Sequence, residues 1–176
     1  MTARPRRFLA GLLVALVSVP AFAADTQPTL LAAYKNWSAF QASTSDGKTC
    51  YVLAHPKSSE PKKAARDPMY FLISDWPSRN AKSEPQIVPG YQFKEDSKVT
   101  AQVGSDKFEF FTKNDGGAGS AWVKDPADET RLIAAMKRGA QVIVTGISQR
   151  GTMTHDTYSL GGLSAALTKI HTACGM

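Results

Sequence analysis

Serine, lysine and histidine side chains are the first candidates for chemistry in this sequence of 176 residues. Ser59 and Lys62 match the spacing S-x-x-K, in which a lysine one helical turn after a serine activates its hydroxyl as a nucleophile. Prolines at positions 56, 61 and 68 are unfavourable for such a helix, and the sequence contains neither of the accompanying motifs S-D-N and K-T-G. The motif therefore does not predict a serine–lysine enzyme.

The three histidines, His55, His155 and His171, could act as general bases beside a serine and an acid. The sequence has no G-x-S-x-G motif that would expose a serine nucleophile, and it has no H-x-H or H-E-x-x-H spacing. We therefore expect no metal and no cofactor. The glycine-rich run 114–119 lacks the lysine of a phosphate loop and is expected to be a turn.

The two cysteines, Cys50 and Cys174, are the residues whose pairing can be predicted. Leu163, Leu167, Ile170 and Cys174 share one face of a helix, so the thiol points toward the side on which the leucines are buried. In an oxidising compartment an even number of cysteines favours a disulfide between Cys50 and Cys174. The bond would close a loop of about 125 residues and tie the two ends of the domain together.

The segment from His55 to Pro68 is rich in proline, serine, lysine and alanine, and it is expected to be an exposed loop whose part from Lys57 to Asp67 is basic. Its basic residues are Lys57, Lys62, Lys63 and Arg66. The segment is either a solvated linker or a surface that contacts an anionic partner. Asp156 is expected to pair with Arg150 or Arg66 in a structural ion pair rather than to act as an acid or base.

The strands that must position these residues follow from alternating hydrophobicity and turn residues. Segments 37–42 and 49–54 are predicted to form a hairpin across the polar stretch 43–48, with Cys50, Val52 and Ala54 on one face. Further strands are expected at 69–76, 86–93, 98–103 and 107–112, around Trp122, and at 140–148 and 153–159. Trp37, Trp76 and Trp122 lie in apolar strands and are expected in the core.

Two helices complete the predicted elements. The first begins after Asp125 as N-cap, with Pro126 as its first residue, and ends before Gly139. The second carries Cys174, with His171 on its surface. Short strands with frequent turns and two helices predict a mainly β fold, either an antiparallel β-sandwich or an open barrel with two short helices, the C-terminal one tied by the disulfide.

Residues 1–23 have the pattern of a secretory signal peptide. Three arginines precede an apolar run at 8–19, and the cleavage motif Ala21-Phe22-Ala23 follows that run. The run is shorter than the roughly 20 residues that a membrane span needs. We expect cleavage near Ala23, leaving 24–176 as a single β-rich domain with its core at about 31–174. The mature chain keeps 18 basic and 15 acidic residues, and a net charge of +3 does not predict nucleic-acid binding.

A series of short motifs lies along the mature chain, each at one position. They are Trp37-Ser38, Cys50-Tyr51, 56–61, Arg66-Asp67-Pro68 with Tyr70, Phe110-Phe111-Thr112, Ala121-Trp122-Val123, 134–137, Arg150-Gly151-Thr152, and 156–160 with Gly162. In this order, and with the two cysteines, the chain from about Leu31 to Cys174 resembles the invasion-associated locus B family. The resemblance implies an exported periplasmic or envelope-associated protein with no established enzymatic reaction, and it supplies no catalytic or ligand residues.

These observations predict an exported periplasmic, envelope-associated or secreted protein that acts by binding and is not an enzyme. Its partner is expected to be an anionic envelope or host-surface component, or another envelope protein, but not a nucleic acid. No transmembrane span is expected after cleavage. The alternative is a secreted hydrolase whose serine–histidine site has no recognisable motif.

Overall fold

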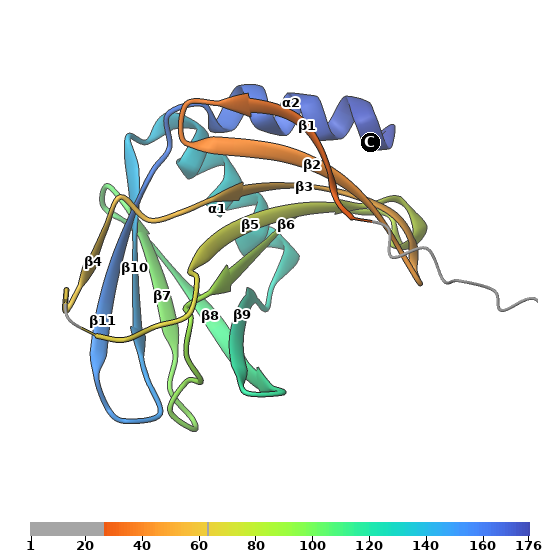
Figure 1. Cartoon of the computed structure of the whole chain (residues 1–176). Helices are drawn as coiled ribbons and strands as arrows, with labels where there is room; N and C mark the ends of the chain where they lie inside the picture. The colour runs from red at the N-terminus through yellow and green to blue at the C-terminus, as the bar shows by residue number, and fades with distance from the viewer. Residues whose placement is uncertain (1–26, 63) are drawn as a thin grey trace, which may run out of the picture.

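The computed structural model describes residues 27–62 and 64–176, as eleven strands, two α-helices and one short 3₁₀ turn (Figure 1). The predicted signal peptide and Lys63 lie outside the described residues. The strands are β1 (Thr29–Tyr34), β2 (Trp37–Thr44), β3 (Gly47–Ala54), β4 (Ser58–Glu60), β5 (Tyr70–Trp76), β6 (Ala81–Val88), β7 (Val99–Val103), β8 (Asp106–Asp115), β9 (Ala118–Val123), β10 (Gln141–Ile147) and β11 (Met153–Ser159). The 3₁₀ turn is Pro77–Arg79, and the helices are α1 (Pro126–Arg138) and α2 (Leu163–Cys174).

All the strands belong to one antiparallel sheet in the order β1-β2-β3-β5-β6-β9-β8-β7-β10-β11-β4. The sheet curls, so that the half with β1, β2, β3, β5 and β6 and the half with β7, β10, β11 and β4 turn toward each other (Figure 1). The edge strands β1 and β4 each pair with one neighbour and do not pair with each other. The predicted mainly β, antiparallel fold with two helices is confirmed. Of the two predicted architectures, a β-sandwich and an open barrel, the structure has the open one, as a single curled sheet.

The core follows from the alternation of side chains along the strands. The predicted hairpin forms from β2 and β3, and Cys50, Val52 and Ala54 on β3 are all buried, as expected. Trp37 on β2 is fully buried and meets the ring of Phe71 on β5 edge to face. Residues on these inner faces come from both halves of the sheet, so one core fills the curl.

The two helices begin and end where their sequences predict. Asp125 caps α1 by accepting a hydrogen bond from the backbone N–H of Ala127 at 2.8 Å, and the helix ends at Gly139. Its buried face packs against β6, β8 and β9. Helix α2 lies along β1, β2 and β3 at the top of Figure 1. No helix among residues 27–62 and 64–176 is long and apolar enough to cross a membrane.

The disulfide between Cys50 and Cys174 is present, and the prediction is confirmed. The two Cα atoms lie 5.9 Å apart, and 124 positions separate the residues in the sequence. Leu163, Leu167 and Ile170 are buried on the same helical face as Cys174. The bond therefore joins α2 to β3 inside the core, where the helical periodicity placed it.

Three expectations differ from the structure. The strand expected at 86–93 is β6, at Ala81–Val88. It includes Pro85, which cannot donate to a ladder and is therefore unfavourable for a strand in a prediction from sequence. Trp76 and Trp122 are only half buried. Trp122 lies on the outer face of the sheet beside the ring of Phe111, 5.9 Å away, because it alternates with the buried residues Ala121 and Val123.

Candidate functional site: a groove between four loops

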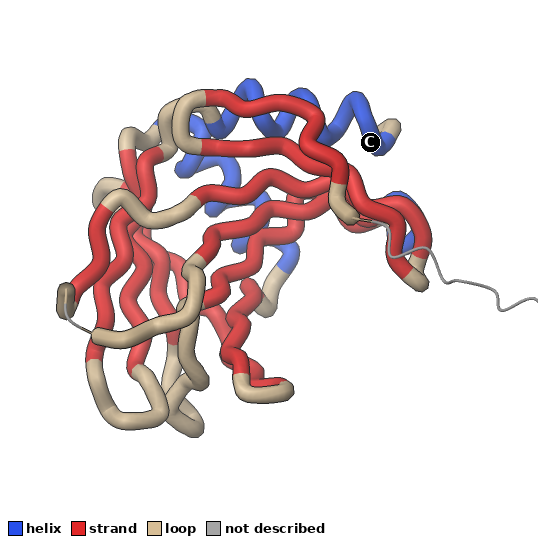
Figure 2. Tube along the Cα trace, in the orientation of Figure 1, coloured by secondary structure: helices blue, strands red, loops and turns tan. Residues whose placement is uncertain are grey.

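A groove of about 720 Å³ lies at the end of the sheet away from α2. Residues 64–67, 90–92, 117 and 148–154 line it, and they come from four separate connections between strands. The loops at the lower end of Figure 2 are these connections. We call this feature the loop groove. Its volume lies within the range of about 300–1,000 Å³ that is typical of small-molecule sites.

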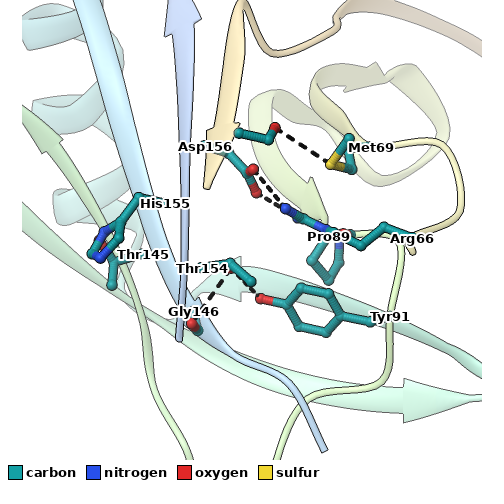
Figure 3. Close-up of polar contacts among 10 residues, drawn as sticks. Arg66, Met69, Pro89, Tyr91, Thr145, Gly146, Thr154, His155 and Asp156 are labelled. Atoms are coloured by element: carbon teal, nitrogen blue, oxygen red, sulfur yellow. Dashed lines mark hydrogen bonds and ion pairs between the residues drawn. The ribbon is translucent and has the colours of Figure 1, made fainter. Parts of the chain in front are cut away.

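Arg66, at the floor of the loop groove, forms a buried ion pair with Asp156 behind it (Figure 3). Two guanidinium nitrogens, Nη1 and Nη2, donate to the two carboxylate oxygens at 2.7 and 2.6 Å, and Nε and Nη2 also donate to the carbonyl oxygen of Pro89. The side chains are only 5% and 2% exposed. Of the two partners that the sequence allowed for Asp156, the structure has Arg66.

Tyr91 and Thr154 continue this polar network (Figure 3). The hydroxyl oxygens of the two residues lie 2.7 Å apart, and Thr154 donates to the carbonyl of Gly146, so the phenol is the donor to Thr154. The guanidinium of Arg66 stands over the Tyr91 ring, 4.9 Å from its centroid. Burial raises the pKa of Tyr91, so the phenol stays protonated in this network.

The wall of the loop groove at residues 64–67 is fixed to the sheet by backbone contacts as well as by Arg66. The backbone N–H of Asp67 donates to the carbonyl of Gly90 at 3.0 Å. Gly90 has φ +72°, and a Cβ at this position would overlap the carbonyl oxygen of Asp67. Glycine is therefore required here for both the backbone conformation and the close approach of the two chains.

The predicted contact loop is more ordered than its composition indicated. Residues 58–60 form the edge strand β4, which pairs with β11, and residues 64–67 form a wall of the loop groove. Lys57 and Lys62 are exposed, as expected. Arg66 differs from the expectation, because its side chain is buried against Asp156 and is not available to a partner.

The sequence-predicted catalytic candidates are not brought together. Ser59 lies on strand β4 and its hydroxyl contacts the sulfur of Met69 at 3.7 Å, so Lys62 does not follow it by a helical turn. His55 is exposed beside the ring of Tyr70, at a centroid distance of 5.0 Å. His155 is also exposed, and its Nδ1 lies 3.0 Å from the hydroxyl of Thr145 (Figure 3). None of the three histidines lines the loop groove.

A second cluster, which the sequence did not predict, joins Asp75, Ser83 and His171. The imidazole Nε2 of His171 lies 2.9 Å from the hydroxyl of Ser83 and 3.7 Å from the Asp75 carboxylate. Asp75 is fully buried; its Oδ1 accepts the backbone N–H of Ser83, and its Oδ2 has no hydrogen-bond partner. His171 was expected on the helix surface, yet its side chain is only 18% exposed.

Burial sets the titration of this cluster. It raises the pKa of Asp75, although the hydrogen bond from Ser83 and the positive charge of His171 act in the opposite direction. Burial also lowers the pKa of His171. The one feature of the sequence that could have indicated this cluster is Asp75, a charged residue within a largely apolar strand. Ser83 and a stretch of α1 also line a second, smaller pocket of about 390 Å³.

The described residues hold no group of three or more histidine, cysteine, aspartate or glutamate side chains that could bind a metal ion. In the loop groove the buried charges neutralise each other, and the exposed rim carries polar side chains. The described residues that line the groove contain no serine–histidine pair that could perform nucleophilic chemistry.

Comparisons with known proteins agree with this fold. The family model described as "Invasion associated locus B (IalB) protein" matches residues 37–171. A solved structure, the invasion associated protein B of Bartonella henselae, is similar with a TM-score of 0.57 and 16% sequence identity, over 82% of this chain and 97% of that chain. No curated protein matches the sequence.

Proposed function

The chain belongs to the invasion associated locus B family, and from that premise we propose that it is an exported, envelope-associated protein that acts by binding rather than by catalysis. Cleavage near Ala23 would release residues 24–176 into the periplasm or to the cell surface. The proposed partner is an anionic component of the envelope or of a host surface, or another envelope protein.

The observation that carries this proposal is the construction of the loop groove. Its floor is an ion pair in which both charges are already satisfied, and its rim carries the exposed side chains of Asp67, Gln149 and Arg150. A buried, fully paired arginine and aspartate stabilise the loops and do not need a substrate. Free polar groups on a fixed frame are what a binding site requires.

The contact with an anionic partner is assigned to the lysines beside the loop groove. Lys57 and Lys62 are exposed, and the segment that they flank runs directly into the groove wall at 64–67. Surface charges of this kind steer and strengthen contact with a negative surface. Arg66 is left out of this contact because it is buried in its ion pair.

The test compares wild type with the triple variant K57E/K62E/K63E in binding to isolated envelope fractions and to host-cell surfaces. Binding should weaken in the variant, and wild-type binding should fade as salt shortens the Debye length from ~10 Å at 0.1 M to ~3 Å at 1 M. The control K107E/K113E/K124E makes the same charge change at three exposed lysines outside this segment. Equal binding by wild type and both variants, at matched melting temperature, would remove the lysines from the proposal.

A second candidate function, a serine hydrolase, is favoured by one contact, the 2.9 Å approach of Ser83 to His171 beside the smaller pocket. Ser83 also has a positive φ of 59°, a strained conformation found at some nucleophiles. In a catalytic triad, however, the acid contacts the imidazole nitrogen that the serine does not use, whereas Asp75 approaches the same Nε2 as Ser83. Covalent labelling by a fluorophosphonate that is lost in Ser83→Ala would establish the hydrolase and overturn the non-enzymatic proposal.

A further inference from the structure

We propose that the loop groove binds a neutral, polyhydroxylated ligand, a short oligosaccharide. This inference rests on the proposed binding function and names the ligand class for that site. It concerns the groove itself, whereas the lysines at 57, 62 and 63 were assigned to an anionic surface.

The charges of the loop groove favour a neutral ligand. Arg66 and Asp156 neutralise each other at the floor. Asp67 and Arg150 are exposed at the rim, carry opposite charges, and have no side-chain partner among the described residues. Four formal charges of the groove therefore sum to zero. A polyanion would meet the Asp67 carboxylate, and complementarity is best for a ligand without net charge.

The free hydrogen-bonding groups of the groove match hydroxyl groups. The side chains of Gln92, Gln149 and Thr152 line it and have no hydrogen-bond partner among residues 27–62 and 64–176. Each carboxamide offers donors and an acceptor, and a hydroxyl is both at once. A sugar hydroxyl, which also donates and accepts, can satisfy such groups in either orientation. Tyr91 also lines the groove, but its ring is already covered by the Arg66 guanidinium, so recognition is assigned to the two carboxamides and the hydroxyl.

The backbone around the groove argues against a peptide strand as the ligand. An extended peptide binds by adding to a strand edge with free N–H and C=O groups. Here the lining segments are bonded to each other: Asp67 N–H to Gly90 O, Gln149 N–H to Gln92 O at 2.7 Å, and Ser148 N–H to Thr152 O at 2.9 Å. These pairings occupy backbone groups that an added peptide strand would need, which favours recognition by side chains and suits a saccharide better than a peptide backbone.

The frame of the groove is fixed before any ligand arrives. Arg66 joins the 64–67 wall to β11 through Asp156 and to the Pro89 carbonyl, and the Tyr91–Thr154–Gly146 chain of hydrogen bonds fixes the floor. Because these loops are tied to one another, binding need not order them. Preorganisation of this kind improves the affinity of a site with few contacts.

The experiment titrates the oxidised mature protein by calorimetry with three neutral tetrasaccharides: maltotetraose, cellotetraose and chitotetraose. Dextran sulfate serves as the polyanion and tetra-alanine as the peptide. At least one neutral tetrasaccharide should bind, and Gln92→Ala and Gln149→Ala should each weaken it about three- to tenfold, as expected for one lost hydrogen bond. The matched controls Gln141→Ala and Arg138→Ala change exposed residues away from the groove lining and should leave the affinity unchanged.

The proposal is overturned if none of the neutral tetrasaccharides binds at millimolar concentration, or if Gln92→Ala and Gln149→Ala bind like the controls. It is also overturned if the protein binds dextran sulfate or tetra-alanine and these two variants weaken that binding instead. If the saccharide experiment fails but envelope fractions still bind wild type better than K57E/K62E/K63E, the proposed function is retained. If only the envelope-binding experiment fails, the saccharide site is retained.

Discussion

Replacing one partner of the Arg66–Asp156 ion pair should destabilise the protein far more than replacing both. In Asp156→Leu the guanidinium stays buried with only the Pro89 carbonyl as acceptor, and in Arg66→Met the carboxylate loses both of its donors. Each single variant thus leaves an uncompensated charge inside the protein. The double variant Arg66→Met/Asp156→Leu removes both charges and fills the same space with apolar groups.

The expected magnitudes follow from this burial. Breaking a buried pair from one side costs about 3–5 kcal/mol, a large part of the roughly 5–15 kcal/mol that stabilises a domain. Replacing both partners by apolar residues is often close to neutral, and here the Pro89 carbonyl also loses its donors, which costs about 1–3 kcal/mol. The double variant should therefore be more stable than either single variant.

Urea unfolding of the oxidised mature protein measures these differences as shifts of the midpoint at constant m-value. The exposed pair Lys98–Glu109, with a separation of 2.8 Å similar to that of the buried pair, is the matched control. Its single and double variants should change the free energy of unfolding little, because solvent screens both charges. The reasoning is refuted if the losses in the two Arg66 and Asp156 single variants simply add in the double variant, or if the single variants are as mild as the exposed control.

Three further predictions concern the disulfide, the buried histidine and the leader. Changing Cys50 and Cys174 together to serine should lower the free energy of unfolding by up to about 5 kcal/mol, and urea midpoints equal to those of the oxidised protein would contradict this. Because burial lowers the pKa of His171, the unfolded chain takes up its proton first as pH falls below about 6.5, and folded-state stability is lost in that window. The stability advantage of wild type over His171→Gln should therefore shrink between about pH 7.5 and pH 5. A difference independent of pH would show that protonation of His171 is not linked to unfolding. Asp75, whose pKa is raised, changes the free energy of unfolding with pH in the opposite direction, and it does so in both proteins. The mature protein should begin at or within a residue of Ala24, as intact mass will report, and a chain that retains Arg4 would mean that the leader is not cleaved.

Features that depend on neighbours in the sequence could be predicted. The cap of α1 at Asp125 and the buried face of β3 follow from local residue types and from periodicity, which tertiary contacts do not change. The disulfide could be predicted because two cysteines allow only one intramolecular pairing. The half-exposed Trp122 could not, because alternation alone does not say which face of a strand is covered when both faces carry apolar residues.

The candidate sites depend on contacts that are distant in the sequence. Arg66 and Asp156 are separated by 90 positions, and Ser83 and His171 by 88. The sequence offered two arginines for Asp156 and could not choose between them, since only the sheet order places β4 and the following loop beside β11. The loop groove needs four loops to converge, and no single loop carries a motif for it. The Asp75 cluster required the register of β5 with β6 and the docking of α2.

The disulfide and the loop groove lie at opposite ends of this fold. The disulfide and α2 hold the end of the sheet at β1 to β3, where Cys50 is fully buried, whereas the loop groove lies at the other end, where the β10–β11 turn and the loops after β4 and β6 meet (Figure 1). Arg66 lines the groove and is held by Asp156, so this ion pair both ties the loops to the sheet and shapes the groove. Loss of the disulfide should therefore lower stability without reshaping the groove, while loss of the ion pair should affect both.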